Sequence, residues 1–160
     1  MTTDYAEAGK VIEIIKDIPI TMLTTRSQTG LASRPLTVIE VSDDGDLWFF
    51  TTADSDLARE VEADSEVNAA FSTSRQWVSL SGTGSIVHDA VKKQQLFDSM
   101  VEAFSDSDPL DPQTVLLHVQ GESAQYWENP GGIFSVAASW VKHKLTGQRA
   151  MPGHSGTTEL

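Results

Sequence analysis

The stretch LWFFTTADS, residues 47–55, carries the strongest structural signal in the sequence. Its first six residues are apolar, aromatic or β-branched, which is typical of a buried strand and too short a run for a helix. Residues 43–46, DDGD, precede it and tolerate the backbone of a tight turn. Asp54 and Ser55 follow, with side-chain oxygens that can cap the first N–H groups of a helix. The stretch therefore predicts a turn, a strand and a short helix that runs through Asp64.

Upstream of this stretch, the pattern predicts a helix and a hairpin. Apolar residues at three- and four-residue spacing predict an amphipathic helix over residues 5–17. Two β-rich runs, residues 20–25 and 31–41, flank the turn-forming residues 27–30. Pro35 lies within the second run, and because proline cannot donate to a β-ladder, we expect it on an edge strand or at a bulge.

Downstream, the remaining β-rich and helical runs complete a small barrel. Further strands are predicted at residues 67–72, 77–88 and 114–120, helices at 89–104 and around 136–144, a loop at 105–112 and a polar tail from 146. Gly82 and Gly84 are available where the long strand at 77–88 bends. About six strands with few, peripheral helices predict a mainly β fold, a small closed β-barrel. We expect one domain over residues 1–160, with its core at about 8–130 and an extension and tail at 131–160.

The composition excludes several classes of function. A formal net charge of −12 and the lack of a Lys/Arg cluster argue against nucleic-acid binding. There is no cysteine, hence no disulfide or thiolate nucleophile, and the four histidines lack the spacing of a metal site, so no bound metal is predicted. The first residues do not have the pattern of a signal peptide, and no run approaches a membrane span. We therefore expect a cytoplasmic protein without a membrane partner.

Physical chemistry alone indicates one candidate site, at the junction of strand and helix in residues 51–55. Hydroxyl groups there lie beside the free N–H groups and the positive dipole end of a helix, a place that suits a phosphate. The alternative is that Thr51, Thr52 and Ser55 only cap the helix. Arg34, in mid-strand, needs either a ligand anion or a carboxylate such as Glu40.

Four motifs in sequence order resemble the general stress protein branch of the pyridoxamine 5'-phosphate oxidase-like superfamily, whose members are FMN-binding split β-barrels. They are SRPL at 33–36, DLWFFT at 46–51, VSLSG at 78–82 and AQYW at 124–127. The resemblance implies a six-stranded split barrel of the FMN-binding type that forms a homodimer and holds FMN, a small-molecule cofactor, at the subunit interface.

Position by position, the resemblance implies a set of cofactor-binding residues. They are Ser33, Arg34, Pro35, Phe50, Thr51, Thr52, Ser55, Leu57, Trp77 and Trp127. Arg34 and Pro35 correspond to residues that meet the flavin and its phosphate, and the Phe50–Ser55 segment to the wall and the phosphate-binding turn. Trp77 corresponds to a contact from the partner subunit, and Trp127 to the aromatic residue that closes the same site.

The sequence departs from the family pattern at two places. Leu57 stands where members usually carry a lysine that neutralises the FMN phosphate, and the next cation is Arg59. The loss of one charge-assisted hydrogen bond predicts FMN binding weakened by roughly ten- to a hundredfold, and Leu57→Lys is predicted to tighten it. Trp127 is followed by residues 133–137, IFSVA, instead of the Arg- and His-bearing segment of the true oxidases, which argues against vitamin B6 oxidation.

Two functions remain open at this point. The first is an FMN-dependent oxidoreductase of unknown substrate, in which the flavin performs the electron or hydride transfer; no side chain stands out as catalytic. The second is a non-catalytic binding module with a weakened phosphate site, which serves as a flavin reservoir, a stress-related sensor, or a carrier of deazaflavin or haem.

Overall fold

The computed structural model describes residues 2–100, 111–129 and 154–160. The helix predicted around 136–144 and most of the loop predicted at 105–112 lie outside these residues. The elements in chain order are α1 (Thr2–Lys16), β1 (Ile20–Ser27), β2 (Gly30–Thr37), β3 (Glu40–Val41), β4 (Leu47–Thr52), α2 (Asp56–Ala63), β5 (Glu66–Ser72), β6 (Gln76–Val87), α3 (Ala90–Asp98), β7 (Thr114–Glu128) and β8 (His154–Glu159). No helix among the described residues is long and apolar enough to cross a membrane.

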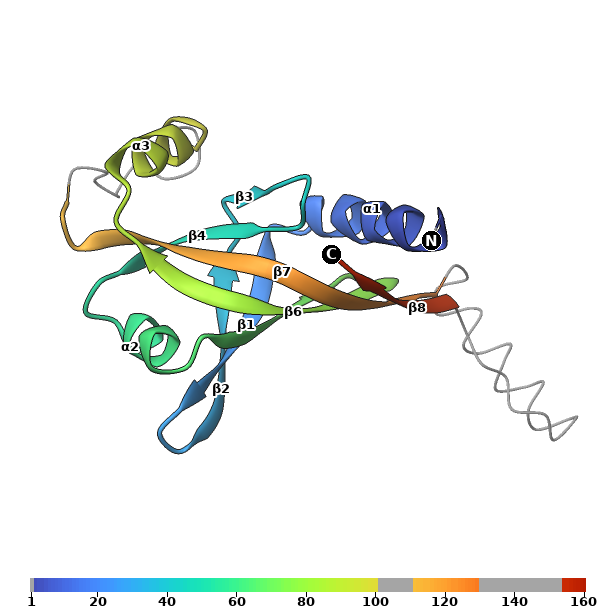
Figure 1. Ribbon diagram of the computed structural model, residues 1–160, viewed down its shortest axis with the longest axis horizontal. Helices are drawn as coiled ribbons and strands as arrows, with labels where there is room; N and C mark the ends of the chain where they lie inside the picture. Colours follow the sequence, from blue (N-terminus) through green and yellow to red (C-terminus); the bar gives the residue numbers. More distant parts are fainter. Residues whose placement is uncertain (1, 101–110, 130–153) are drawn as a thin grey trace, which may run out of the picture.

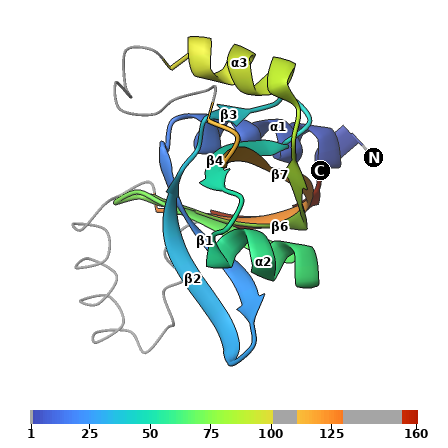
Figure 2. The same cartoon turned by 90° about the vertical axis from the view of Figure 1, so that its left-hand side faces the viewer.

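The strands form one antiparallel sheet that curls into a split barrel, as Figure 2 shows from one end. Its order is β2-β1-β5-β6-β7-β4-β3, and β8 pairs with β7 outside this path. The predicted mainly β fold is confirmed, although the sheet has eight strands within the described residues where about six were expected. In both views α2 and α3 lie on opposite sides of the sheet (Figures 1 and 2).

The hairpin of β1 and β2 follows the sequence pattern closely. Ile20 pairs with Thr37 at one end and Ser27 with Gly30 at the other, where Gly30 takes a positive φ of 136°. β2 is an edge strand of the sheet, so Pro35 lies where its missing N–H leaves no gap in a central ladder. The predicted run 31–41 is interrupted, because β2 ends at Thr37 and the chain then pairs with β4 as β3.

A β-bulge bends the central pair, β6 and β7. The register shifts between Ser81 and Gly82, so that Ser81 pairs with Ser123 but Gly82 with Gly121, which leaves Glu122 as the extra residue. A Cβ on Gly82 would lie 2.1 Å from the carbonyl oxygen of Gln120. Glycine is therefore required here by the close approach of two backbones.

The C-terminal residues differ from the prediction. β7 runs on to Glu128, whereas the predicted strand ended at Gln120, and β8 forms from residues assigned to a polar tail. β8 pairs with the distal half of β7 and buries Thr158 opposite Ala124. Its composition is polar and glycine-containing, so the strand depends on the free edge of β7 rather than on its own propensity.

The core lies between the inward faces of the strands and two of the helices. α1 contributes Val11 and Ile15, and α2 contributes Leu57 and Val61 to the same cluster of buried side chains. Phe49 and Phe71 are the largest of its fully buried side chains among the described residues. α2 begins where predicted, because Ser55 accepts a hydrogen bond from the N–H of Ala58 at 3.1 Å. α3 is capped by Asp89 and ends at Asp98, which is shorter than the predicted helix.

Gly82→Ala is expected to destabilise the protein by about 1–3 kcal/mol, because the new methyl group would force the two backbones of the bulge apart. Urea unfolding followed by circular dichroism would measure the change. Gly9→Ala in α1 is the control, since nothing lies within 4 Å of that Cβ, and it should raise stability by about 0.5–1 kcal/mol. Equal stability of the two variants would contradict the role assigned to the bulge.

Candidate functional site

The turn between β4 and α2 holds its hydroxyl groups in one hydrogen-bonded set. The side-chain oxygens of Thr51 and Ser55 lie 3.2 Å apart, and Ser55 also donates to the carbonyl of Thr52 at 2.7 Å. Ser55 caps Ala58, whereas the N–H groups of Asp56 and Leu57 lack intrahelical acceptors by the geometry of a helix start. The turn therefore combines a cap with two N–H groups that can donate hydrogen bonds to an anion.

Arg34 is engaged by the protein itself. Its Nη2 donates to Glu60 Oε2 at 2.6 Å and its Nη1 to Thr25 Oγ1 at 3.0 Å, and Thr25 also donates to the same carboxylate oxygen at 2.6 Å. These donors lower the pKa of the Glu60 carboxyl, with the Thr25 hydrogen bond as the largest cause and that of Arg34 next. The sequence predicted that Arg34 pairs with a ligand anion or with a carboxylate such as Glu40, and the observed partner is Glu60 on α2.

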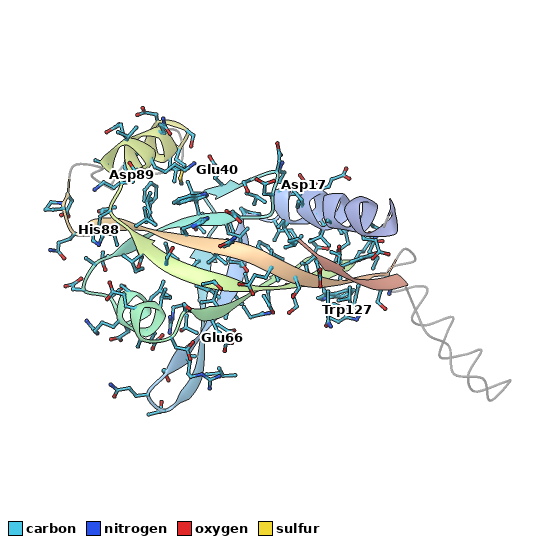
Figure 3. All side chains as sticks on the ribbon, in the orientation of Figure 1. Asp17, Glu40, Glu66, His88, Asp89 and Trp127 are labelled. Atoms are coloured by element: carbon cyan, nitrogen blue, oxygen red, sulfur yellow. The ribbon has the colours of Figure 1, made fainter. Side chains whose placement is uncertain are left out.

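Glu40 has another partner on the opposite side of the molecule. It pairs with Lys92 of α3 at 2.7 Å, and the same ammonium lies 4.8 Å from the ring centroid of Trp48. Figure 3 shows Glu40 beside α3, on the side of the sheet away from α2. Lys92 therefore fastens α3 to the strands beneath it.

Arg59, the other cation near the turn, is also paired. Its guanidinium donates to the carboxylate of Asp56 and to the backbone carbonyl of Asp54. The side chain is exposed, so this ion pair contributes little to stability, but it does place a negative charge next to the cation.

An apolar pocket of about 280 Å³ opens between β2, β4 and α3. Pro35 and Phe50 wall it from the strands, and Phe97 and Met100 close it from α3 and the residues after it. The rings of Phe50 and Phe97 meet at 5.5 Å between centroids, in a tilted arrangement. No charged side chain lines the pocket among the described residues, so it suits a flat, largely apolar group.

Ser33 and Arg34 point to opposite sides of β2. Ser33 is exposed and shares a 2.6 Å hydrogen bond with Thr24, whereas Arg34 is half-buried against Glu60. Strand alternation thus separates Ser33 and Pro35 from Arg34.

Trp77 and Trp127 are neighbours, although 50 positions separate them in the sequence. They form a cross-strand pair of β6 and β7, and their exposed fractions are 40% and 42%. Trp127 projects near the end of the sheet that is far from α2 and from His88 (Figure 3). Within one chain, the structure does not bring the tryptophans to Arg34 or to Ser55.

Leu57 does not face the turn. Its side chain is 4% exposed and belongs to the core cluster with Val61. The expectation that Leu57→Lys would add a phosphate contact is therefore revised, because the side chain at this position packs in the interior, where an ammonium group is costly.

Sequence reasoning missed Thr25, Glu60, Phe97 and Met100. The hairpin register could have placed Thr25 beside Arg34, since inward positions of adjacent strands are neighbours. No local signal identifies Glu60 as the partner of Arg34, because that contact depends on how α2 docks against the hairpin. No cluster of three or more potential metal ligands occurs in the described ranges.

Comparison with known proteins shows that this chain matches one protein family and shares its fold with several solved structures. The family model described as pyridoxamine 5'-phosphate oxidase like matches residues 6–151. Protein bli-3 of Neurospora crassa is 32% identical over an alignment 142 residues long, which covers 81% of this chain and 68% of the relative.

Solved structures share the architecture at lower identity. A protein related to general stress protein 26, of the pyridoxinephosphate oxidase family, from Clostridium acetobutylicum superposes with a TM-score of 0.67 at 17% identity, over 83% of this chain and 99% of the other. A pyridoxamine 5'-phosphate oxidase-related, FMN binding protein from Nostoc punctiforme gives a TM-score of 0.59 at 14% identity, over 97% and 94% of the two chains.

Leu57→Lys is expected to cost about 2–5 kcal/mol of stability, comparable to the loss of a core leucine, because the lysine must leave the core or bury its charge. Leu57→Met, which conserves volume, should cost less than about 1.5 kcal/mol. Thermal unfolding of the two variants measures the difference. A Leu57→Lys protein as stable as wild type would show that this position can reach solvent.

Proposed function

The chain belongs to the pyridoxamine 5'-phosphate oxidase-like family, and from this premise we propose that it binds FMN at the interface of a homodimer. The fold relative from Nostoc punctiforme is described as FMN binding. The observation that carries the proposal is the apolar pocket walled by Pro35 and Phe50, together with the capped turn into which the strand of Phe50 leads. Phe50 and Thr51 are consecutive in β4, so the strand that walls the ring compartment ends at the anion site.

In the proposed complex, the isoalloxazine ring lies against Pro35 and Phe50. The phosphate lies at the start of α2, near Thr51, Thr52 and Ser55, where two backbone N–H groups and the helix dipole attract an anion. Arg34 approaches from β2, and Ser33 contacts the ligand from the exposed face of the same strand. Leu57 supports the turn by packing beneath it.

The position of the tryptophans supports a homodimer. Thr52 pairs with Thr114 at the start of β7, and Trp127 lies thirteen residues further along this strand, which corresponds to about 40 Å of extended chain. One chain cannot bring both ends to one flavin, but a second copy related by a two-fold axis can. The exposed apolar side chains on the outer face of the sheet, namely Ile20, Met22, Trp77 and Trp127, suit such an interface.

FMN would supply electron or hydride transfer, and the chain would supply position and shielding from water. None of the described residues that line the pocket carries an acidic or basic group, so we assign the chemistry of the oxidoreductase to the flavin. The pairing of both nearby arginines with carboxylates favours a second candidate function, a flavin carrier without turnover. Sustained oxidation of NADH or NADPH by the FMN-loaded protein would distinguish the oxidoreductase from the carrier.

FMN titrated into the protein is expected to show perturbed visible bands and quenched flavin fluorescence. Phe50→Ala should weaken binding by about tenfold, since it removes the ring wall of the pocket. Val91→Ala is the control, because this α3 residue is 67% exposed and does not line the pocket. Absence of binding at high micromolar FMN would contradict the proposal.

A mixed-dimer experiment tests the shared site. Phe50→Ala and Trp127→Ala are each expected to impair FMN binding, because every interface site needs Phe50 from one protomer and Trp127 from the other. An equimolar mixture that has been unfolded and refolded together should recover about a quarter of the intact sites, since half of the dimers are then heterodimers with one complete site each. Absence of recovery, with both variants dimeric, would mean that each flavin contacts both residues of the same protomer, and would contradict a shared site.

A further inference from the structure

Arg34, which the family resemblance assigns to the flavin and its phosphate, meets a carboxylate of its own chain. Its guanidinium contacts Glu60 at 2.6 Å, and the Arg34 and Glu60 side chains retain only 25% and 16% of their exposure. Thr25, itself buried, bonds to both partners and fixes their geometry. This three-residue network is distinct from an exposed surface pair, because it is half-buried and each member is held by the other two.

No described cation near the turn remains to replace Arg34. Arg59 is bound to Asp56, and Leu57 lies in the core. Residues 54–60 carry three carboxylates, those of Asp54, Asp56 and Glu60, but only one cationic group, the guanidinium of Arg59. An arriving phosphate dianion would therefore meet an Arg34 charge that is already neutralised and a helix start that carries acidic groups.

We propose that Glu60 is a specificity-determining residue that competes with the ligand phosphate for Arg34, so that the site binds flavins by their ring and gains little from the 5'-phosphate. Riboflavin and FMN then bind with similar affinity. This inference rests on the proposed function, because it concerns the same flavin site, and it names the class of ligand that the site accepts: flavins irrespective of phosphorylation.

The ring compartment and the phosphate region contribute to flavin binding through different residues. The pocket between Pro35, Phe50 and Phe97 has no charged lining residue among those described, and it contacts the part that both flavins share. Glu60 acts only through Arg34 on the phosphate. It is a positioning residue, and a change at Glu60 should alter the preference between FMN and riboflavin without altering ring binding.

The test measures dissociation constants of FMN and of riboflavin for wild type, Glu60→Gln and Glu62→Gln by flavin fluorescence quenching. Glu60→Gln keeps the shape and hydrogen-bonding capacity of the side chain but removes its charge. Glu62→Gln is the matched control, because it removes the same charge from an exposed position of the same helix. The ratio of the two constants is insensitive to partial loss of folding, since unfolded protein lowers the apparent affinity for both flavins equally.

For wild type and for Glu62→Gln we expect the two dissociation constants to agree within about threefold, whereas Glu60→Gln should favour FMN by about tenfold or more, the effect of one charge-assisted contact. A wild-type preference for FMN above about a hundredfold, or an unchanged ratio in Glu60→Gln, would overturn the role of Glu60 and leave the flavin site intact. Binding of neither flavin to the wild type would instead refute the proposed function, and the inference with it.

Discussion

The long antiparallel ladder between β6 and β7 is the constraint on which the rest of the structure depends. They are the two longest of the described strands, and they lie at the centre of the strand order with β5 on one side and β4 on the other. The bulge at Gly82 bends the pair, so that the sheet curls around the core instead of lying flat. β8 can form only because β7 extends beyond its pairing with β4 and leaves an edge to cover.

The same ladder separates the parts of the proposed flavin site. One end of β7 lies beside the turn that leads into α2, and the other carries Trp127 opposite Trp77. A strand is a stiff, extended spacer, so its length decides which residues a single chain can bring together. If flavin contacts both ends, as we propose, the second copy of the chain is part of the site and not an accessory to it.

Electrostatics act locally in this acidic protein. The net charge of −12 makes the surface anionic as a whole, but the ligand preference that we propose depends on one half-buried network in which Glu60 neutralises Arg34. Burial matters because ion pairs are screened less when solvent is excluded. Arg59 also forms an ion pair with a carboxylate, that of Asp56, but this pair is exposed to solvent and therefore has much less influence on its surroundings than the pair of Arg34 and Glu60.

The sequence by itself determined most of the helices and strands, but few of the contacts between them. The apolar, aromatic and β-branched run at residues 47–52, the cap at Ser55 and the turn at Gly30 are local signals, so strand, helix and hairpin were predictable near their observed bounds. The edge position of Pro35 followed from its missing N–H. Only the tertiary structure decided that polar residues 154–159 form a strand, that Leu57 faces the core and that Glu60 holds Arg34. Each of these depends on which surface packs against the segment, and contacts between residues far apart in the chain leave no periodic trace in the sequence.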